Sequence, residues 1–275
     1  MVKINIEINP INIYLEEKIS NAVVIKGNYK KLNNQVINIL KEFAKKNNNI
    51  TLEDILSIRS AYMNIKIMKR HTKLLKNINK FYKLYKKRIN ISEMSKKYDL
   101  SPIQLLKHIF LKMNFSKHEI KEFFYLKNLS KLNSFDINQI KFALKNDIFN
   151  KVDQSEQLKN SGNFEKEIEI FLVQNKIKFK TQEQLAKIQI QKYGKPINTP
   201  DFLILSDFFI NNQKINWIDA KNFYGANTFL INKKIKKQVD KYINKFGFGC
   251  IMFSLNFSEK LSFDNILFVN FYNRV

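Results

Sequence analysis

The sequence is poor in cysteine, and it contains no long apolar run. Its single cysteine, Cys250, excludes an internal disulfide framework and cannot by itself build a four-ligand zinc site. No apolar stretch reaches the length of a membrane span, and residues 1–20 lack the uninterrupted apolar core of a signal peptide. We therefore expect a soluble protein of a reducing, intracellular compartment with no membrane partner.

Acidic residues are also scarce. The chain has 48 Lys and Arg against 24 Asp and Glu, a formal charge of +24. This excess favours a polyanionic partner, and nucleic acid is the best candidate because binding to its phosphates releases counterions. A genome rich in A and T, which inflates Lys, Asn and Ile, explains part of the excess. With 275 residues and 44% hydrophobic residues, the chain is long and apolar enough for two domains.

The first domain, predicted over residues 1–155, is all-helical. Helical periodicity recurs from residue 33 to about 149, and Thr51 followed by Asp54 marks a helix start, with the helix running to about Arg70. Beyond it, lysines spaced by three and four residues form one stripe on a helix. This stripe either contacts the phosphates of a nucleic acid or is an ordinary solvent-exposed face. The candidate nucleic-acid contacts in this stripe are Lys69, Lys73, Lys76 and Lys80.

A helix-turn-helix pattern follows at residues 91–112. It consists of a short helix, a tight turn, and a second helix capped by Ser101 with Pro102 at its first position. In a DNA-binding motif of this kind Gln104 and Lys107 would touch the DNA, together with His108 and Lys112. A plain helical hairpin that only packs the core fits the pattern as well.

The second domain is predicted over residues 160–275, after a polar linker at 151–163. The order of elements there is a helix (164–175), a short extended segment (177–180), a helix (182–191), two strands, a helix and two further strands. This order predicts an α/β fold.

Two strands of this domain flank Asn211 and Asn212, a pair that suits a two-residue hairpin turn. The first strand begins at Asp201 and the second ends at Asn222. If the turn is centred on the asparagines, counting back along both strands places Asp201 opposite Asn222, next to Lys221.

The second strand carries Asp219 and Lys221, which are two residues apart and therefore share one face. The hairpin thus gathers two carboxylates and one amine. Such carboxylates suit Mg²⁺ or Mn²⁺ and leave positions for water and a phosphate oxygen. The lysine would orient or deprotonate the water, or stabilise the transition state. The expected metal ligands are Asp201, Asp219 and the carbonyl of Ala220.

A third acid is expected from the helix that precedes the hairpin. Glu165 follows the apolar Phe164, which can pack the helix against the sheet, and is therefore the first candidate. Glu169 lies one turn further on and is the second candidate, whereas Glu167 reads as solvated.

These fragments together resemble the TPD-motif nucleases, a PD-(D/E)xK branch that includes the codanin-interacting nucleases of animals. The resemblance rests on Thr199-Pro200-Asp201-Phe202, Trp217-Ile218-Asp219-Ala220-Lys221, Phe223-Tyr224-Gly225, Gln238, Tyr242, Asn244 and Phe246-Gly247-Phe248-Gly249. It implies a restriction-endonuclease-like αβββαβ core, action in or near the nucleus, and a codanin-like partner. The catalytic residues that it implies are Glu165, Asp201, Asp219, Lys221 and Gln238.

Lysines surround Gln238 in the sequence. A basic helix beside the site would guide a phosphate backbone toward it. The alternative is that these lysines only form a solvent-exposed face. Lys233 and Lys237 are the candidate contacts. The sequence therefore predicts a metal-dependent nuclease that hydrolyses phosphodiester bonds, with DNA preferred over RNA. The alternative is a catalytically inactive nucleic-acid-binding or scaffold protein with the same fold.

Overall fold

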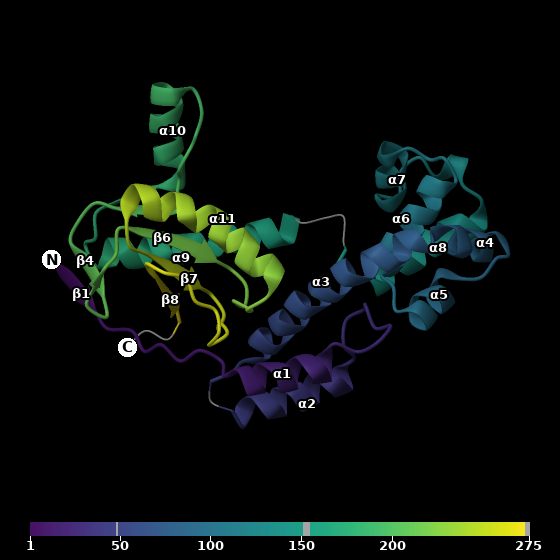
Figure 1. Ribbon diagram of the computed structural model, residues 1–275, viewed down its shortest axis with the longest axis horizontal. Coiled ribbons are helices and arrows are strands. Elements are labelled where there is room, and N and C mark those ends of the chain that lie inside the picture. Colours follow the sequence, from purple (N-terminus) through teal and green to yellow (C-terminus); the bar gives the residue numbers. More distant parts are fainter. Residues whose placement is uncertain (48, 151–154, 273–275) are drawn as a thin grey trace. The chain divides into compact units, whose positions relative to one another are not determined.

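The computed structural model describes residues 1–47, 49–150 and 155–272, and its elements are labelled in Figure 1. The chain forms two compact units. Unit 1 contains residues 1–19 and 44–58 and those from 155 onward, and unit 2 contains residues 20–43 and those from 59 to 150. Each unit is built from separate stretches of the chain. Residues 1–19 and 44–58 precede the expected boundary near 155–160 but belong to the same unit as the residues that follow it.

Unit 1 contains a five-stranded and a three-stranded sheet. The strands are β1 (Val2–Ile4), β2 (Phe179–Thr181), β3 (Phe202–Ile204), β4 (Phe208–Ile210), β5 (Gln213–Lys214), β6 (Trp217–Lys221), β7 (Gly249–Phe253) and β8 (Ile266–Asn270). The larger sheet has the order β2-β3-β6-β7-β8, antiparallel from β2 to β6 and parallel from β6 to β8. The smaller sheet has the order β1-β4-β5, and its strand β1 was not predicted from the sequence.

Helices cover both faces of the larger sheet (Figure 1). The helices of this part are α9 (Ser155–Gln174), α10 (Gln182–Tyr193) and α11 (Phe229–Phe246). On one face Ile168 of α9 packs in the same core cluster as Ile218, and on the other Val239 of α11 clusters with Trp217. Neighbouring residues of a strand point to opposite faces, so the odd-numbered residues of β6 point toward α11.

The predicted hairpin is present, but its register differs from the count made on the sequence. Asn211 and Asn212 form the turn, with left-handed φ values of 49° and 63° that asparagine tolerates. Further from the turn, the pairing of Phe202 with Ile218 places Asp201 opposite Asp219. The prediction that Asp201 lies opposite Asn222 was therefore wrong.

An insertion of three residues explains the changed register. Close to the turn, the Ile215 N–H donates to the Phe208 carbonyl, whereas the Ile204 N–H donates to the Asn216 carbonyl. Residues 205–207 therefore lie between Ile204 and Phe208, whose partners Asn216 and Ile215 are adjacent on the other arm, and they form a large β-bulge with three extra residues. The Leu205 N–H is directed to the Lys178 carbonyl instead.

The predicted linker at 151–163 is wrong in its second part. Residues 151–154 lie outside the described residues, and α9 already begins at Ser155. The polar stretch lacks an apolar period because the residues of its later part, from Asn160 to Asn163, are exposed or half-buried. A helix segment without a buried stripe leaves no periodic signal in the sequence.

Unit 2 is helical. Helices α1 (Ile13–Val23), α2 (Asn34–Lys45) and α3 (Leu52–Lys76) each contribute residues to both units. The others are α4 (Ile78–Lys86), α5 (Ile91–Tyr98), α6 (Pro102–Lys112), α7 (Lys117–Phe124), a 3₁₀ turn (Leu129–Lys131) and α8 (Ser134–Asn146). The predicted fold class is confirmed, with a helical region at 13–146 followed by mixed sheets interleaved with helices. Among the described residues, no helix combines the length and apolarity needed to cross a bilayer.

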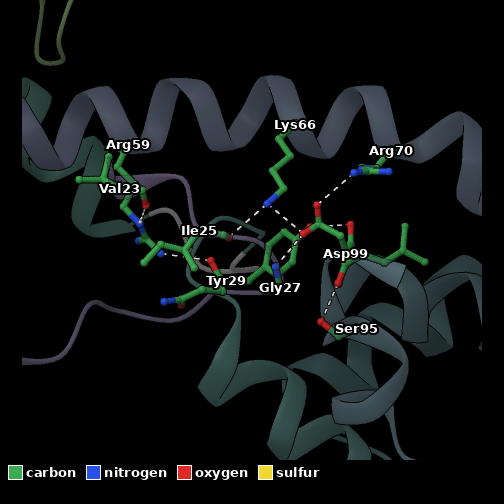
Figure 2. A network of polar contacts seen from close by, with 11 residues as sticks. Val23, Ile25, Gly27, Tyr29, Arg59, Lys66, Arg70, Ser95 and Asp99 are labelled. Atoms are coloured by element: carbon green, nitrogen blue, oxygen red, sulfur yellow. Dashed lines mark hydrogen bonds and ion pairs between the residues drawn. The ribbon is translucent and has the colours of Figure 1, made fainter. Parts of the chain in front are cut away.

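The two short helices predicted at 91–112 are present as α5 and α6, and polar contacts of Asp99 hold the turn between them (Figure 2). Asp99 ends α5 in the left-handed region at φ 55°. Its buried carboxylate pairs with Lys66 at 2.9 Å and Arg70 at 3.2 Å and accepts the Gly27 N–H at 2.8 Å. The Tyr29 hydroxyl donates to the Asp99 carbonyl at 2.9 Å. One aspartate therefore connects α3, the 27–29 loop and the α5–α6 turn.

The lysine stripe does not lie on one helix. The helix that begins after Thr51 continues to Lys76, beyond the predicted end, and a new helix, α4, begins at Ile78. Asn77 lies between these two helices, and its side chain donates to the Lys73 carbonyl at 2.9 Å. Lys80 consequently belongs to a different helix from the other lysines of the predicted stripe.

Candidate active site

Asp201 and Asp219 meet at one end of the β3–β6 pair. Asp219 is fully buried on the strand face that points toward α11. Asp201 is half-buried, and its Oδ2 accepts the backbone N–H of Ala220 at 2.7 Å. The N–H and C=O of one residue in an extended strand point to the same side, so the Ala220 carbonyl is directed toward the Asp201 side of β6.

A side-chain network attaches this acid pair to α11. Gln238 donates to Oδ1 of Asp219 at 2.9 Å, and its Oε1 accepts from the Lys221 ammonium at 3.1 Å. Lys221 also forms an ion pair with Oδ2 of Asp219, an oxygen that receives no well-oriented hydrogen bond. Tyr242 accepts from Gln238 at 3.3 Å and donates to the Thr199 carbonyl at 3.1 Å. The network therefore joins both predicted motifs.

Trp217 fixes the distance between α11 and the strands. Its indole N–H donates to the Gly247 carbonyl at 2.9 Å, and its ring lies edge-on to Tyr242 with centroids 5.3 Å apart. Gly249 on β7 allows this packing, because a Cβ there would come within 2.0 Å of the indole. The tryptophan of the second motif thus has a structural role beside the two polar residues that follow it.

Burial and mutual repulsion shift the titration of the acids. The pKa of Asp201 lies well above its usual range, first because of burial and then because of the charge of Asp219; the Ala220 N–H and Lys221 partly offset the rise. Burial followed by the charge of Asp219 also raises the pKa of Glu165. Extra positive charge would therefore stabilise the ionised cluster.

The acids on α9 occupy different positions. Glu165 is half-buried beside Phe164, whose ring packs against Phe271 with centroids 5.5 Å apart. Glu167 is exposed and accepts the Tyr272 hydroxyl, whereas Glu169 is half-buried one turn beyond Glu165. The charges of Asp219 and Lys221 both act on the pKa of Glu165, the first raising it and the second lowering it.

The lysines around Gln238 face outward. Lys233 and Lys237 are exposed on α11, while Gln238 is half-buried. Lys233 also lies over the Phe229 ring at 5.7 Å. The helix therefore presents a basic face next to the network that holds its glutamine.

In unit 2, Lys69 and Lys73 are exposed and line a hollow of about 510 Å³ together with Lys66 and Arg70. These four cations follow one face of α3, and Asp99 pairs with two of them. Of the remaining candidates, Lys76 and Lys80 are exposed, and the Lys80 ammonium lies 4.9 Å from the centroid of the Tyr98 ring.

The candidate DNA-reading residues on α6 are engaged within unit 2. Gln104 donates to Asn150 at 3.4 Å, and the Lys107 ammonium lies 5.3 Å from the Phe124 ring centroid. His108 and His71 approach to 3.1 Å between their Nε2 atoms. Six of the eleven residues of α6 are buried, so this helix forms the centre of the helical core and presents little free surface.

Sequence reasoning did not assign two further members of the site. Tyr242 positions Gln238, and the helical spacing of four between them was the available signal. Gln189 on α10 holds the loop before the first motif by donating to the Asn198 carbonyl at 2.6 Å and accepting two backbone N–H groups. A buried glutamine between exposed neighbours gives no comparable signal.

Comparison with known proteins agrees with the motifs. Residues 133–270 match a family described as "Protein of unknown function TPD sequence-motif". The chain is 27% identical over 160 residues to "Uncharacterized protein L539" of Acanthamoeba polyphaga mimivirus, a match that covers 57% of this chain and 50% of that protein. The chain thus spans about half the length of the curated relative it matches. No solved structure matches the chain.

Proposed function

We propose that this chain, which belongs to the TPD sequence-motif family of proteins of unknown function, is a divalent-metal-dependent nuclease of the PD-(D/E)xK kind that hydrolyses nucleic acid, DNA in preference to RNA. One observation carries the proposal. Asp219 and Lys221 are buried at the end of a strand and form a polar cluster with the half-buried Gln238, and Asp201 lies opposite. Burying several titratable groups is costly, and clusters of this kind occur at functional sites.

The donor set fits a hard cation. Asp201, Asp219 and the Ala220 carbonyl would supply oxygen ligands, the type that Mg²⁺ and Mn²⁺ prefer. The raised pKa of Asp201 supports this fit, because a cation would relieve the repulsion between the acids. Among the described residues, no group of three or more His, Cys, Asp or Glu side chains could hold a metal ion, and the proposed donor set accordingly combines two carboxylates with one backbone carbonyl. When bound, the cation would offset charge on the phosphate and activate water.

The side chains of the protein have separate tasks in this proposal. Gln238 and Asp219 hold the Lys221 ammonium in one place, from which it orients the attacking water or stabilises charge on the phosphoryl oxygens. Glu165 has a raised pKa and is half-buried, so its carboxylate can accept the proton that this water loses. The exposed Lys233 and Lys237 would contact the phosphate backbone on either side of the scissile bond.

A cleavage assay tests the proposal. Wild type and the isosteric variant Asp219→Asn are incubated with Mg²⁺ or Mn²⁺ and single-stranded, duplex and branched DNA, and with RNA. We expect wild type to cut at least one substrate, and Asp219→Asn to lose about 100-fold or more of that activity. Asp264→Asn, a change at an exposed acid of the same unit, is the control.

Two outcomes would contradict the proposal. Equal cleavage by wild type and Asp219→Asn would show that Asp219 is not part of the active site. Salt-sensitive binding by wild type without cleavage in either metal would favour the inactive binding or scaffold protein.

A further inference from the structure

The strongest unassigned surface lies at the free end of α10. This helix stands away from the rest of unit 1 (Figure 1). Leu185 and Gln189 are its buried residues, one turn apart, so one narrow stripe attaches it to the unit. Its last turn and the loop that follows, residues 190–197, are exposed throughout.

Apolar side chains concentrate on this exposed end. Ile190 is 50% exposed, Tyr193 is 48% exposed, and Ile197 is 47% exposed. The spacing of three between Ile190 and Tyr193 puts them on the same side of the helix. Exposed apolar side chains gathered at one end of an element are a feature of interaction sites.

The charge of residues 184–200 indicates which class of partner this surface would bind. Residues 184–200 contain no acidic residue, and Lys192 and Lys195 lie within the exposed end. Lys192 extends over the Tyr193 ring, with its ammonium 5.3 Å from the ring centroid. Apolar and aromatic groups flanked by lysine suit nucleic acid, in which bases present apolar faces between phosphates.

Hydrogen bonds at both ends of α10 also attach it to residues next to the candidate active site. The Asp201 carbonyl accepts the Gln182 backbone N–H at 2.9 Å at the start of α10. At the other end, Gln189 accepts the N–H groups of Ile197 and Asn198 at 2.7 and 3.0 Å. The loop therefore returns directly to Thr199 and the first motif, and its position is fixed relative to the acids.

We propose that the end of α10, formed by Ile190, Tyr193 and Ile197, is a wedge that stacks against unpaired bases at a junction between duplex and single strands, next to the bond that is cut. This inference rests on the proposed nuclease function and names its substrate class. Apolar wedges that insert between base steps are a general means of recognising opened or bent duplexes.

Binding measurements without catalysis test the wedge. Fluorescein-labelled splayed duplex and blunt duplex of the same length are titrated in EDTA, and anisotropy gives the dissociation constants. We expect the double variant Ile190→Ser/Tyr193→Ser to bind the splayed duplex about tenfold more weakly, which is within the range for losing one stacked base. Its binding to the blunt duplex should stay unchanged. The matched control is Ile170→Ser/Val173→Ser, which removes two exposed apolar side chains from α9.

A second readout separates stacking from folding effects. With 2-aminopurine at the junction, we expect the wild type but not the double variant to change its fluorescence, and Tyr193→Phe to retain the change. Equal losses on both duplexes, or no loss on either, would overturn the wedge. Unchanged DNA binding with altered self-association of the double variant would overturn it in favour of a protein partner.

The two proposals fail separately. If no substrate is cleaved but the binding contrast persists, the nuclease assignment fails and the wedge stands as a binding element. If cleavage depends on Asp219 but all substrates bind and are cut alike by the double variant, the nuclease stands and the wedge fails.

Discussion

Gln238 donates a hydrogen bond of 2.9 Å to the carboxylate of Asp219, across the boundary between α11 and the strand that it covers. The same amide accepts from Lys221. One neutral side chain thus satisfies an acid and a base that are both buried. An amide suits this position because it donates and accepts at once.

Replacing this amide tests its role as a positioning residue. Gln238→Met keeps the length of the side chain and removes both hydrogen bonds, so we expect cleavage to fall about 10- to 100-fold, as for other residues that orient metal ligands. The concentration of Mn²⁺ needed for half-maximal activity should rise as well. Asp240→Asn, at an exposed acid on the same helix, should change neither quantity. An unchanged Mn²⁺ requirement would show that Gln238 does not support the metal ligands.

Removal of divalent metal should lower the stability of unit 1. A ligand that binds only the folded state stabilises it by about 2.7 kcal/mol at 100 times its dissociation constant. We expect saturating Mn²⁺ to raise the melting temperature of wild type relative to EDTA, and not that of Asp219→Asn. This measurement needs no substrate. A similar rise in both proteins would locate the metal elsewhere.

Gly249 and Gly162 provide a paired test of packing. A Cβ at Gly249 would lie 2.0 Å from the Trp217 ring, so Gly249→Ala should destabilise by about 1–3 kcal/mol or more. Gly162, within α9, has no atom within 4 Å of the added Cβ, and Gly162→Ala should stabilise by about 0.4–1 kcal/mol. Urea unfolding followed by the fluorescence of Trp217 measures both changes. Equal effects of the two substitutions would contradict the packing at β7.

The network around Asp99 predicts how the stability of unit 2 depends on pH. Burial raises the pKa of Asp99, but Lys66, the Gly27 N–H and Arg70 together hold it below the ordinary value of 3.8. The ionised carboxylate therefore stabilises the folded state fully above that value, and the stabilisation is lost as pH falls through the lower pKa of the folded state. Amide hydrogen exchange of α5 and α6 measures this loss.

Asp99→Asn should remove that dependence. We expect wild type to be more protected than the variant near neutral pH and the difference to shrink below pH 3.8. Glu93→Gln, at an exposed acid of the same unit, should behave as wild type. A difference that stays constant down to low pH would mean that the charge of Asp99 contributes nothing.

Much of the local structure followed from the chain itself. Ser101 and Pro102 start α6 where predicted, because a capping hydroxyl and a fixed proline φ act within a few residues. The turn at Asn211 and Asn212 formed for the same kind of reason. Asp219 and Lys221 share a face because strand periodicity is a local property.

The pairing of Asp201 with Asp219 could not be counted from the turn. Residues 205–207 are inserted in one arm only, and the Leu205 N–H donates to the carbonyl of Lys178, which directly precedes β2 and lies more than twenty residues earlier in the chain. No pattern within the hairpin reveals a bulge that a distant strand stabilises. Similarly, the polar start of α9 and the break at Asn77 depend on packing and give weak periodic signals.

The sequence by itself determined the residue types of the candidate site, the shared face of Asp219 and Lys221, and the positions of many helices, because spacing and capping act over a few residues. The tertiary structure alone decided which atoms Gln238 contacts and that Tyr242 completes the network. The same structure decided that Gln104 and Lys107 make contacts inside the helical core. It also decided that the apolar end of α10 stays uncovered. These properties depend on which faces of distant elements meet, and local sequence patterns do not encode that choice.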